Sequence, residues 1–179
     1  MTPKDYYRNY IADDRLMELN FQLIQLIHSC TPNHVFEFGC GTGKHLKKLN
    51  DAGIEAHGID ISPGNVSTAI YRHGLTGVNL GDESQLRHYC NYDVVFTCSV
   101  LDHIEEIENI LEEFCRIANK FVIFAEPQYE NREMFYFSHD YEGHGFTRLQ
   151  SNWTSPDDGV TYYLWIKALN GSEIPTHHR

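Results

Sequence analysis

Residues 35–43 read Val-Phe-Glu-Phe-Gly-Cys-Gly-Thr-Gly, and this stretch decides the fold. An apolar run typical of a β-strand ends in three alternating glycines, and residues 44–49 follow with the apolar spacing of a helix. Because glycine has no Cβ, such a turn can take positive φ and let a ligand lie against bare backbone. The helix directs its unpaired N–H groups and the positive end of its dipole to the same place. The stretch therefore predicts a strand, a turn and a helix that bind a nucleotide-like ligand.

The spacing of the glycines argues against two familiar phosphate-binding turns. A dinucleotide-binding turn, G-x-G-x-x-G/A, needs a small residue at position 44, where this chain has Lys44. A P-loop that ends in Gly43-Lys44 would need glycine at position 38 and a hydroxyl at position 45, which are Phe38 and His45. An NAD-dependent oxidoreductase is therefore the weaker interpretation.

The pattern that remains, E-x-G-x-G-x-G, resembles motif I of the class I S-adenosylmethionine-dependent methyltransferases. The resemblance implies that the glycine turn passes under the methionine half of the cofactor, with contacts from Gly39, Cys40, Gly41 and Gly43. It also implies that the Glu37 carboxylate lies near the cationic end of the cofactor. S-adenosylhomocysteine would be the product. On its own the turn could equally be an ordinary β–α connection, so the rest of the chain has to decide.

A second acidic signal follows the next strand. Residues 54–60 read as a strand that ends in Asp60, about 20 positions after Gly41, where doubly wound nucleotide folds hold the ribose hydroxyls. An ionised carboxylate there can accept hydrogen bonds from both hydroxyls. The alternative is that Asp60 only caps the next helix, but Ser62 is itself a good cap and leaves Asp60 for the ligand. We expect Asp60 and Ile61 to contact the cofactor.

The fourth strand carries the third specific stretch. Residues 92–98 form a continuous apolar run of the kind buried on both faces, and Ser-Val-Leu-Asp-His follows. This run resembles motif IV of the same family, which implies that Ser99 and Val100 line the cofactor. His103 is a candidate base or orienting group, or else a histidine packed against the next helix. After the short strand 78–80, the resemblance implies that Asp82, with Glu83 as second choice, meets the adenine amine. The alternative is that Asp82 or Ser84 only caps a helix that runs to Tyr89.

These strands and helices predict the architecture. Five β–α units alternate between residues 34 and 127, which indicates a parallel sheet covered on both faces. Two β-rich runs around a Pro-Asp-Asp-Gly loop at 156–159 predict a closing hairpin. We predict an α/β fold: a three-layer Rossmann-like seven-stranded sheet, mostly parallel, with a C-terminal antiparallel hairpin and, as the resemblance implies, strand order 3-2-1-4-5-7-6. The single domain would comprise an N-terminal segment and helix (1–33), a cofactor-binding core (34–127), an acceptor-side segment (128–145), the hairpin (146–169) and a tail (170–179).

Composition limits the partners. With 14 Lys and Arg against 25 Asp and Glu, the formal net charge is −11, which disfavours nucleic acid and anionic membranes as partners. No apolar run approaches the roughly 20 residues that span a bilayer, and the first residues show no signal-peptide core. The five cysteines, odd in number and without a C-x-x-C pair, favour free thiols in a reducing compartment, so we expect a cytoplasmic protein.

The remaining residues bear on the acceptor. The histidines His139 and His144 lie in the aromatic-rich acceptor-side segment, so His144 joins His103 as a candidate catalytic residue. Three tyrosines near the start form either a lid or a packed segment, and no pattern requires a metal. We expect S-adenosylmethionine-dependent methyl transfer to a small-molecule acceptor, at an oxygen, nitrogen or carbon atom. The alternative is a catalytically silent cofactor-binding scaffold or partner subunit with the same fold.

Overall fold

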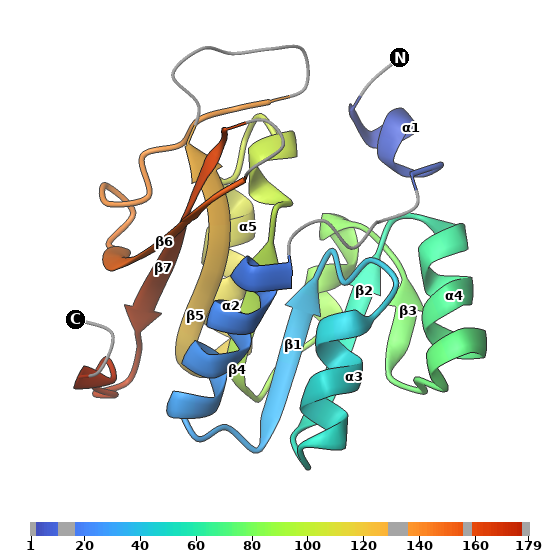
Figure 1. Cartoon of the computed structure of the whole chain (residues 1–179), viewed down its shortest axis with the longest axis horizontal. Helices are drawn as coiled ribbons and strands as arrows, with labels where there is room; N and C mark the ends of the chain where they lie inside the picture. Colours follow the sequence, from blue (N-terminus) through green and yellow to red (C-terminus); the bar gives the residue numbers. More distant parts are fainter. Residues whose placement is uncertain (1–2, 11–16, 129–135, 156–158, 177–179) are drawn as a thin grey trace.

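The computed structural model of the protein describes residues 3–10, 17–128, 136–155 and 159–176 (Figure 1). Seven strands form one sheet in the order β3-β2-β1-β4-β5-β7-β6. Strands β1 to β5 pair in parallel, whereas β7 runs antiparallel to both β5 and β6. The strands are β1 (His34–Phe38), β2 (Glu55–Asp60), β3 (Val78–Leu80), β4 (Tyr92–Cys98), β5 (Ala118–Gln128), β6 (Thr147–Thr154) and β7 (Thr161–Ala168). The predicted fold class and strand order are confirmed.

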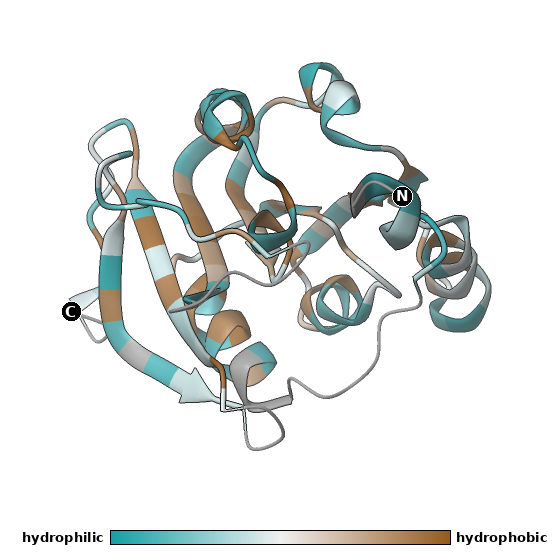
Figure 2. Ribbon diagram, turned by 90° about the horizontal axis from the view of Figure 1, so that it is seen from above, coloured by the Kyte–Doolittle hydropathy of each residue, from teal (hydrophilic) through white to brown (hydrophobic). Residues whose placement is uncertain are grey.

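Helices cover both faces of this sheet and make a three-layer molecule. On the faces lie α2 (Met17–Ser29), α3 (Lys44–Asp51), α4 (Pro63–His73) and α5 (Glu108–Ile117), with the 3₁₀ turns η1 (Glu83–His88) and η2 (Leu101–His103). The short helix α1 (Pro3–Tyr7) lies above the carboxyl ends of the strands instead. Alternate residues of β4 point to opposite sides: Val94 and Phe96 join a core with α2, α3 and α4, and Val95 joins a core with α5 and η1. Figure 2 shows the apolar residues of these helices turned toward the sheet. None of the described helices is both long and apolar enough to span a bilayer.

Local signals set several boundaries as predicted. Helix α4 begins after Ser62, whose Oγ accepts from the Asn65 N–H at 3.4 Å, and it ends at Gly74 with φ 68°. Helix α3 begins at Lys44, directly after Gly43, which takes a left-handed φ of 78° and so lies outside the helix. The segment after Asp82 is the 3₁₀ turn η1, where a helix to Tyr89 was expected.

The apolar residues between 104 and 118 recur at helical spacing and predict a helix over this whole range, which is too long at its start. Helix α5 begins only at Glu108, and Leu101–His103 forms η2. The cause lies in tertiary contacts, because the backbone N–H groups of Val100, Leu101 and Asp102 donate to the buried Glu126 carboxylate of β5. These donors are thereby satisfied outside a helix. The apolar spacing of residues 104–107 reflects burial of Ile107 rather than helical backbone.

Candidate functional site

A cavity of about 780 Å³ lies at the carboxyl edge of β1, β2 and β4. The carboxyl ends of parallel strands meet at one edge of a sheet, and in open α/β sheets ligands bind there. The cavity is lined by nine of the ten expected cofactor residues and by one expected catalytic residue: Glu37, Gly39, Cys40, Gly41, Asp60, Ile61, Asp82, Ser99, Val100 and His103. The two expected residues that do not line it are Gly43, which directly precedes α3, and His144.

The glycine turn needs glycine for two separate reasons. Gly39, Gly41 and Gly43 all have positive φ, of 70°, 53° and 78°, which side chains disfavour. At Gly39, moreover, a Cβ would lie 2.5 Å from Val100 Cγ2, so the loop after β4 packs directly on the turn. At Gly43 a Cβ would lie 2.5 Å from the Leu75 side chain. The turn therefore presents bare backbone to the cavity and lets β1 and β4 approach closely.

Glu37 and His45 form a buried pair beneath the turn. His45 Nδ1 lies 2.6 Å from Glu37 Oε1, and both side chains line the cavity. Burial raises the pKa of the Glu37 carboxyl, while His45 acts to lower it. Glu37 Oε2 and His45 Nε2 are buried and have no protein partner among the described residues. A buried carboxylate oxygen without a partner is costly, and a cationic ligand group would remove that cost.

Asp60 joins the ends of β1 and β2. Its Oδ2 accepts from the Gly41 N–H at 2.7 Å. Its Oδ1 accepts from the Ser62 N–H at 2.8 Å and from Asn65 Nδ2 at 3.1 Å. A carboxylate offers about four acceptor positions, so the protein fills three and leaves one, on Oδ2, toward the cavity. The sequence-based view that Asp60 is wholly available to the ligand is therefore too simple, because Asp60 also fixes both loops.

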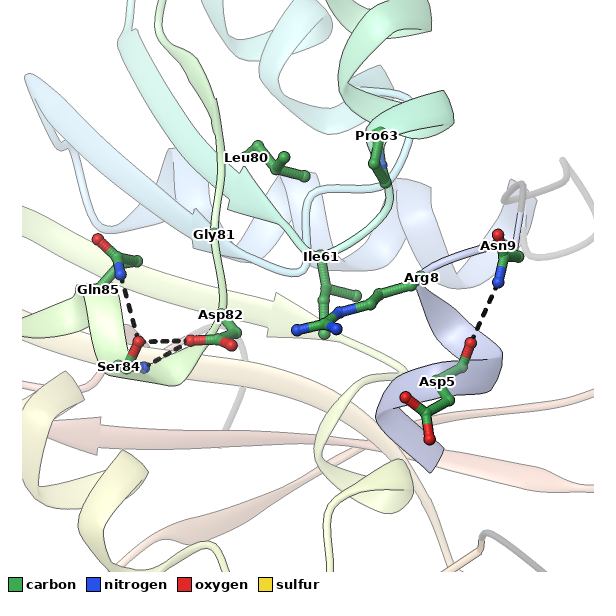
Figure 3. Close-up of a pocket in the computed structure, with 10 residues that line it drawn as sticks. All are labelled: Asp5, Arg8, Asn9, Ile61, Pro63, Leu80, Gly81, Asp82, Ser84 and Gln85. Atoms are coloured by element: carbon green, nitrogen blue, oxygen red, sulfur yellow. Dashed lines mark hydrogen bonds between the residues drawn. The ribbon is translucent and has the colours of Figure 1, made fainter. Parts of the chain in front are cut away.

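The far end of the cavity lies beside β3, where a second hollow of about 590 Å³ adjoins it (Figure 3). The two share Ile61, Gly81 and Asp82. Asp82 caps η1 through the Ser84 N–H at 3.0 Å, as the alternative interpretation of this residue expected, and still lines the cavity. The Ser84 hydroxyl holds the pKa of Asp82 below its usual range. Figure 3 shows the exposed Arg8, which follows α1, extending over Ile61.

Helix α1 lies above the carboxyl ends of the first strands (Figure 1), and its residues Lys4, Tyr6 and Tyr7 line the cavity. Lys4 lies 3.2 Å from Asp82 Oδ2 and also pairs with Glu83. The rings of Tyr6, Tyr7 and Tyr10 contact one another and line the cavity. The structure thus places the N-terminal tyrosines where a lid would lie.

The loop after β4 forms the remaining wall. Ser99 has φ 54°, a left-handed conformation that a residue with a side chain seldom adopts outside special sites. Its N–H donates to the Ala125 carbonyl at 2.9 Å, and Glu126 holds the next residues. His103 reaches the cavity from η2, with Nδ1 2.8 Å from the Tyr7 hydroxyl.

The second catalytic candidate lies elsewhere. His144 belongs to the turn after Tyr141 and is absent from the cavity wall, while its carbonyl accepts from Lys167 Nζ at 2.8 Å. His139 is bound to the Leu101 carbonyl at 3.0 Å, and burial lowers its pKa. The described residues contain no group of three or more His, Cys, Asp or Glu side chains that could hold a metal ion.

Three residues of the site escaped sequence reasoning. His45 attracted notice only as a mismatch to a P-loop, although a histidine two residues after a glycine turn faces the same ligand side. Sequence reasoning treated Glu126 only as part of the end of a strand. Its position as an acidic residue within an otherwise apolar strand could have marked it as a site residue. Tyr7 was expected only as part of a lid or a packed segment; its contact with His103, 96 positions away, is what no local pattern predicts.

Comparisons with known proteins agree with this arrangement. A family profile described as a methyltransferase domain matches residues 36–120. The 18S rRNA (guanine-N(7))-methyltransferase of Bos taurus is 32% identical over 96 residues, which are 46% of this chain and 34% of that protein. The chain therefore spans about a third of the length of this relative.

Solved structures share the fold across most of the chain. The N-methyltransferase NodS from Bradyrhizobium japonicum WM9, in complex with S-adenosyl-L-homocysteine, has a TM-score of 0.73 at 15% identity and covers 94% of this chain and 98% of its own. The magnesium protoporphyrin IX methyltransferase ChlM from Synechocystis PCC 6803, with bound SAH, has a TM-score of 0.67 at 17% identity and covers 84% and 81%. Identities this low establish the shared fold only.

Proposed function

We propose that the chain is a class I S-adenosylmethionine-dependent methyltransferase, which binds S-adenosylmethionine in the 780 Å³ cavity and transfers the methyl group to a small-molecule acceptor. The observation that carries this proposal is the convergence of Glu37, Gly39 and Asp60 on one cavity. The buried Glu37 oxygen without a partner fits an ammonium group, and the bare backbone at Gly39 leaves space that a side chain would fill.

Each part of the cofactor has a counterpart in the cavity wall. The remaining acceptor position of Asp60 would take a ribose hydroxyl, and Glu37 would take the amino group of the methionine half. Ile61 would pack on the adenine, with Asp82 at the adenine edge. The negative charges of Glu37, Asp60 and Asp82 would also favour a ligand that carries a positively charged sulfonium.

Bound here, the cofactor supplies an activated methyl carbon, and the protein's main task is to hold the acceptor in line with it. Such positioning can account for roughly 7–11 kcal/mol of the barrier. The loop at Ser99 and Val100 would form the wall against which the acceptor is placed. A base is required only for an acceptor that carries a proton on the attacking atom.

Two observations favour a small acceptor. The net charge of −11 opposes the approach of a phosphate backbone. Among the described residues, the cavity wall carries several acids beside two lysines, Lys4 and Lys44. The tyrosines of α1 also narrow the opening. An RNA acceptor is the second candidate, because the bovine relative is named for rRNA methylation.

One assay separates these candidates. The protein is incubated with methyl-tritiated S-adenosylmethionine and either total RNA or a metabolite extract freed of macromolecules, with Asp60→Ala as the inactive control. We expect label in the small-molecule fraction and none on RNA. Label on RNA would overturn the small-molecule proposal, and cofactor binding without any transfer would favour the silent scaffold. Thermal shifts with S-adenosylmethionine, S-adenosylhomocysteine and NAD should show stabilisation by the first two alone.

A further inference from the structure

Four side chains form a continuous line from the cavity into the core. The Tyr7 hydroxyl of α1 lies 2.8 Å from His103 Nδ1, and His103 Nε2 lies 3.7 Å from Asp102 Oδ1. Asp102 is in turn hydrogen-bonded to Glu126, and both carboxyls are fully buried. The outer two members, Tyr7 and His103, line the cavity. Such a line can accept a proton at its outer end and stabilise the resulting charge at its inner end.

The inner end consists of two buried acids. Burial, and after it the neighbouring Asp102 carboxylate, raise the pKa of Glu126 well above its usual range, which favours the neutral form of Glu126. The backbone N–H groups of Val100 and Leu101 fix Glu126 in place. The Asp102 carboxylate lies beside His103, with Oδ1 3.7 Å from Nε2, and would stabilise a positive imidazolium. Asp102 and Glu126 are thus positioning residues that act through His103.

The outer end is a neutral hydroxyl. Burial raises the pKa of Tyr7 far above its usual value, so this phenol stays protonated and can donate to His103 Nδ1. The same oxygen has lone pairs left to accept a hydrogen bond from a ligand in the cavity. Ring contacts hold the pair in place. The Tyr7 and His103 ring centroids are 4.3 Å apart, and the His103 and Tyr136 ring centroids are 5.1 Å apart.

We propose, resting on the proposed function, that Tyr7 and His103 deprotonate an aromatic hydroxyl and that the protein is therefore an O-methyltransferase. The acceptor O–H bond breaks as its proton passes to Tyr7, whose own proton moves to His103 Nδ1. The acceptor oxygen then forms its bond to the methyl carbon, while the carbon–sulfur bond breaks and its electron pair stays on sulfur. The proton leaves His103 for solvent after product release.

The cavity itself indicates this acceptor class. A neutral amine attacks a methyl group with its own lone pair and needs no base, whereas a hydroxyl gains greatly from losing its proton. Five tyrosines line the cavity and offer ring faces to a planar acceptor: Tyr6, Tyr7, Tyr10, Tyr136 and Tyr162. A proton-accepting pair within an aromatic wall fits a phenol better than an alkyl amine.

The test compares acceptors that differ only in the proton. Para-cresol is protonated at mildly alkaline pH, para-nitrophenol is largely ionised there, and para-toluidine is the matched amine. In Tyr7→Phe and His103→Gln we expect methylation of para-cresol to fall on the order of 100-fold, because general base catalysis contributes about that much. Methylation of para-nitrophenol should change less than about threefold, because its proton is already gone. Tyr71→Phe, on the exposed face of α4, should change neither rate.

Equal losses with both phenols would overturn the proposal, because a structural defect does not distinguish them. Faster methylation of para-toluidine than of either phenol would overturn it, as would transfer to none of the three. Calorimetry with S-adenosylhomocysteine on the wild type and on each variant separates a failure of the base hypothesis from a failure of the proposed methyltransferase function. Intact binding without phenol methylation removes only this inference, whereas absent binding to the wild-type protein removes the proposed function.

Discussion

Replacing Asp60 by Asn changes one oxygen of the carboxyl to an NH₂ group and removes its charge. The two contacts on Oδ1, from Ser62 and Asn65, can be kept only if the new NH₂ faces the Gly41 N–H, which then has a donor opposite it. A lost hydrogen bond to a buried charged group costs about 1.5–3 kcal/mol. At about 2–4 °C per kcal/mol for a chain of this size, the melting temperature should fall by roughly 3–12 °C.

The same substitution should weaken cofactor binding. The fourth acceptor position of Asp60, on Oδ2, becomes a donor, so a charge-assisted hydrogen bond to the ribose is lost. A loss of about 1.5–3 kcal/mol raises the Kd for S-adenosylhomocysteine by roughly 10- to 150-fold. Differential scanning fluorimetry and calorimetry measure the two effects on one sample.

Asp51→Asn is the matched control for this prediction. Asp51 also follows the glycine turn and loses a negative charge, but its side chain is 61% exposed and pairs with Lys47 on the surface of α3. Exposed pairs contribute about 0–1 kcal/mol, so both readouts should stay close to wild type. An Asp60→Asn protein with unchanged melting temperature and unchanged Kd would refute the two roles that we assign to Asp60.

Further substitutions test the turn, its charge and the helix over the cavity. Gly39→Ala should destabilise the protein more than Gly53→Ala, because both glycines have positive φ but only a Cβ at Gly39 would clash with a neighbour. Melting curves with and without S-adenosylhomocysteine should show weaker binding for Gly39→Ala alone. Burial raises the pKa of Glu37, so this carboxyl takes up a proton readily as pH falls, and only its ionised form attracts an ammonium group. The affinity for S-adenosylhomocysteine, measured by calorimetry, should therefore decrease as the pH is lowered in the wild type and should depend less on pH in Glu37→Gln. The same pH dependence in both proteins would contradict this. Lys4→Ala removes a largely exposed ion pair, so the Kd should rise by less than about fivefold; a larger rise would mean that α1 contributes more to binding than its contacts indicate.

The parts of the site that follow from sequence are those with local signals at fixed spacing. The glycine turn, the acid that ends β2 and the cap at Ser62 each depend on a few neighbouring residues. One β–α–β unit then brings the ends of β1 and β2 together, so the meeting of Gly41 with Asp60 was predictable. Alternation of β–α units predicted the sheet for the same reason.

The parts that did not follow depend on contacts between distant elements. Helical spacing over residues 104–118 predicted a helix, but Glu126 binds the backbone before it and delays α5. His144 was a candidate because its segment often faces acceptors in the family, yet the turn after Tyr141 directs it away from the cavity. The contact between Tyr7 and His103 needs the whole sheet to bring α1 over η2.

The central claim is that the edge of the sheet at Gly39 and Asp60 binds the cofactor. The most direct measurement is a crystal structure of the protein with S-adenosylhomocysteine. Our account predicts the ribose on the Asp60 carboxylate, the amino group on Glu37 and the adenine against Ile61. The compound bound at another surface, or crystals soaked with it in which side chains fill this cavity, would contradict the account.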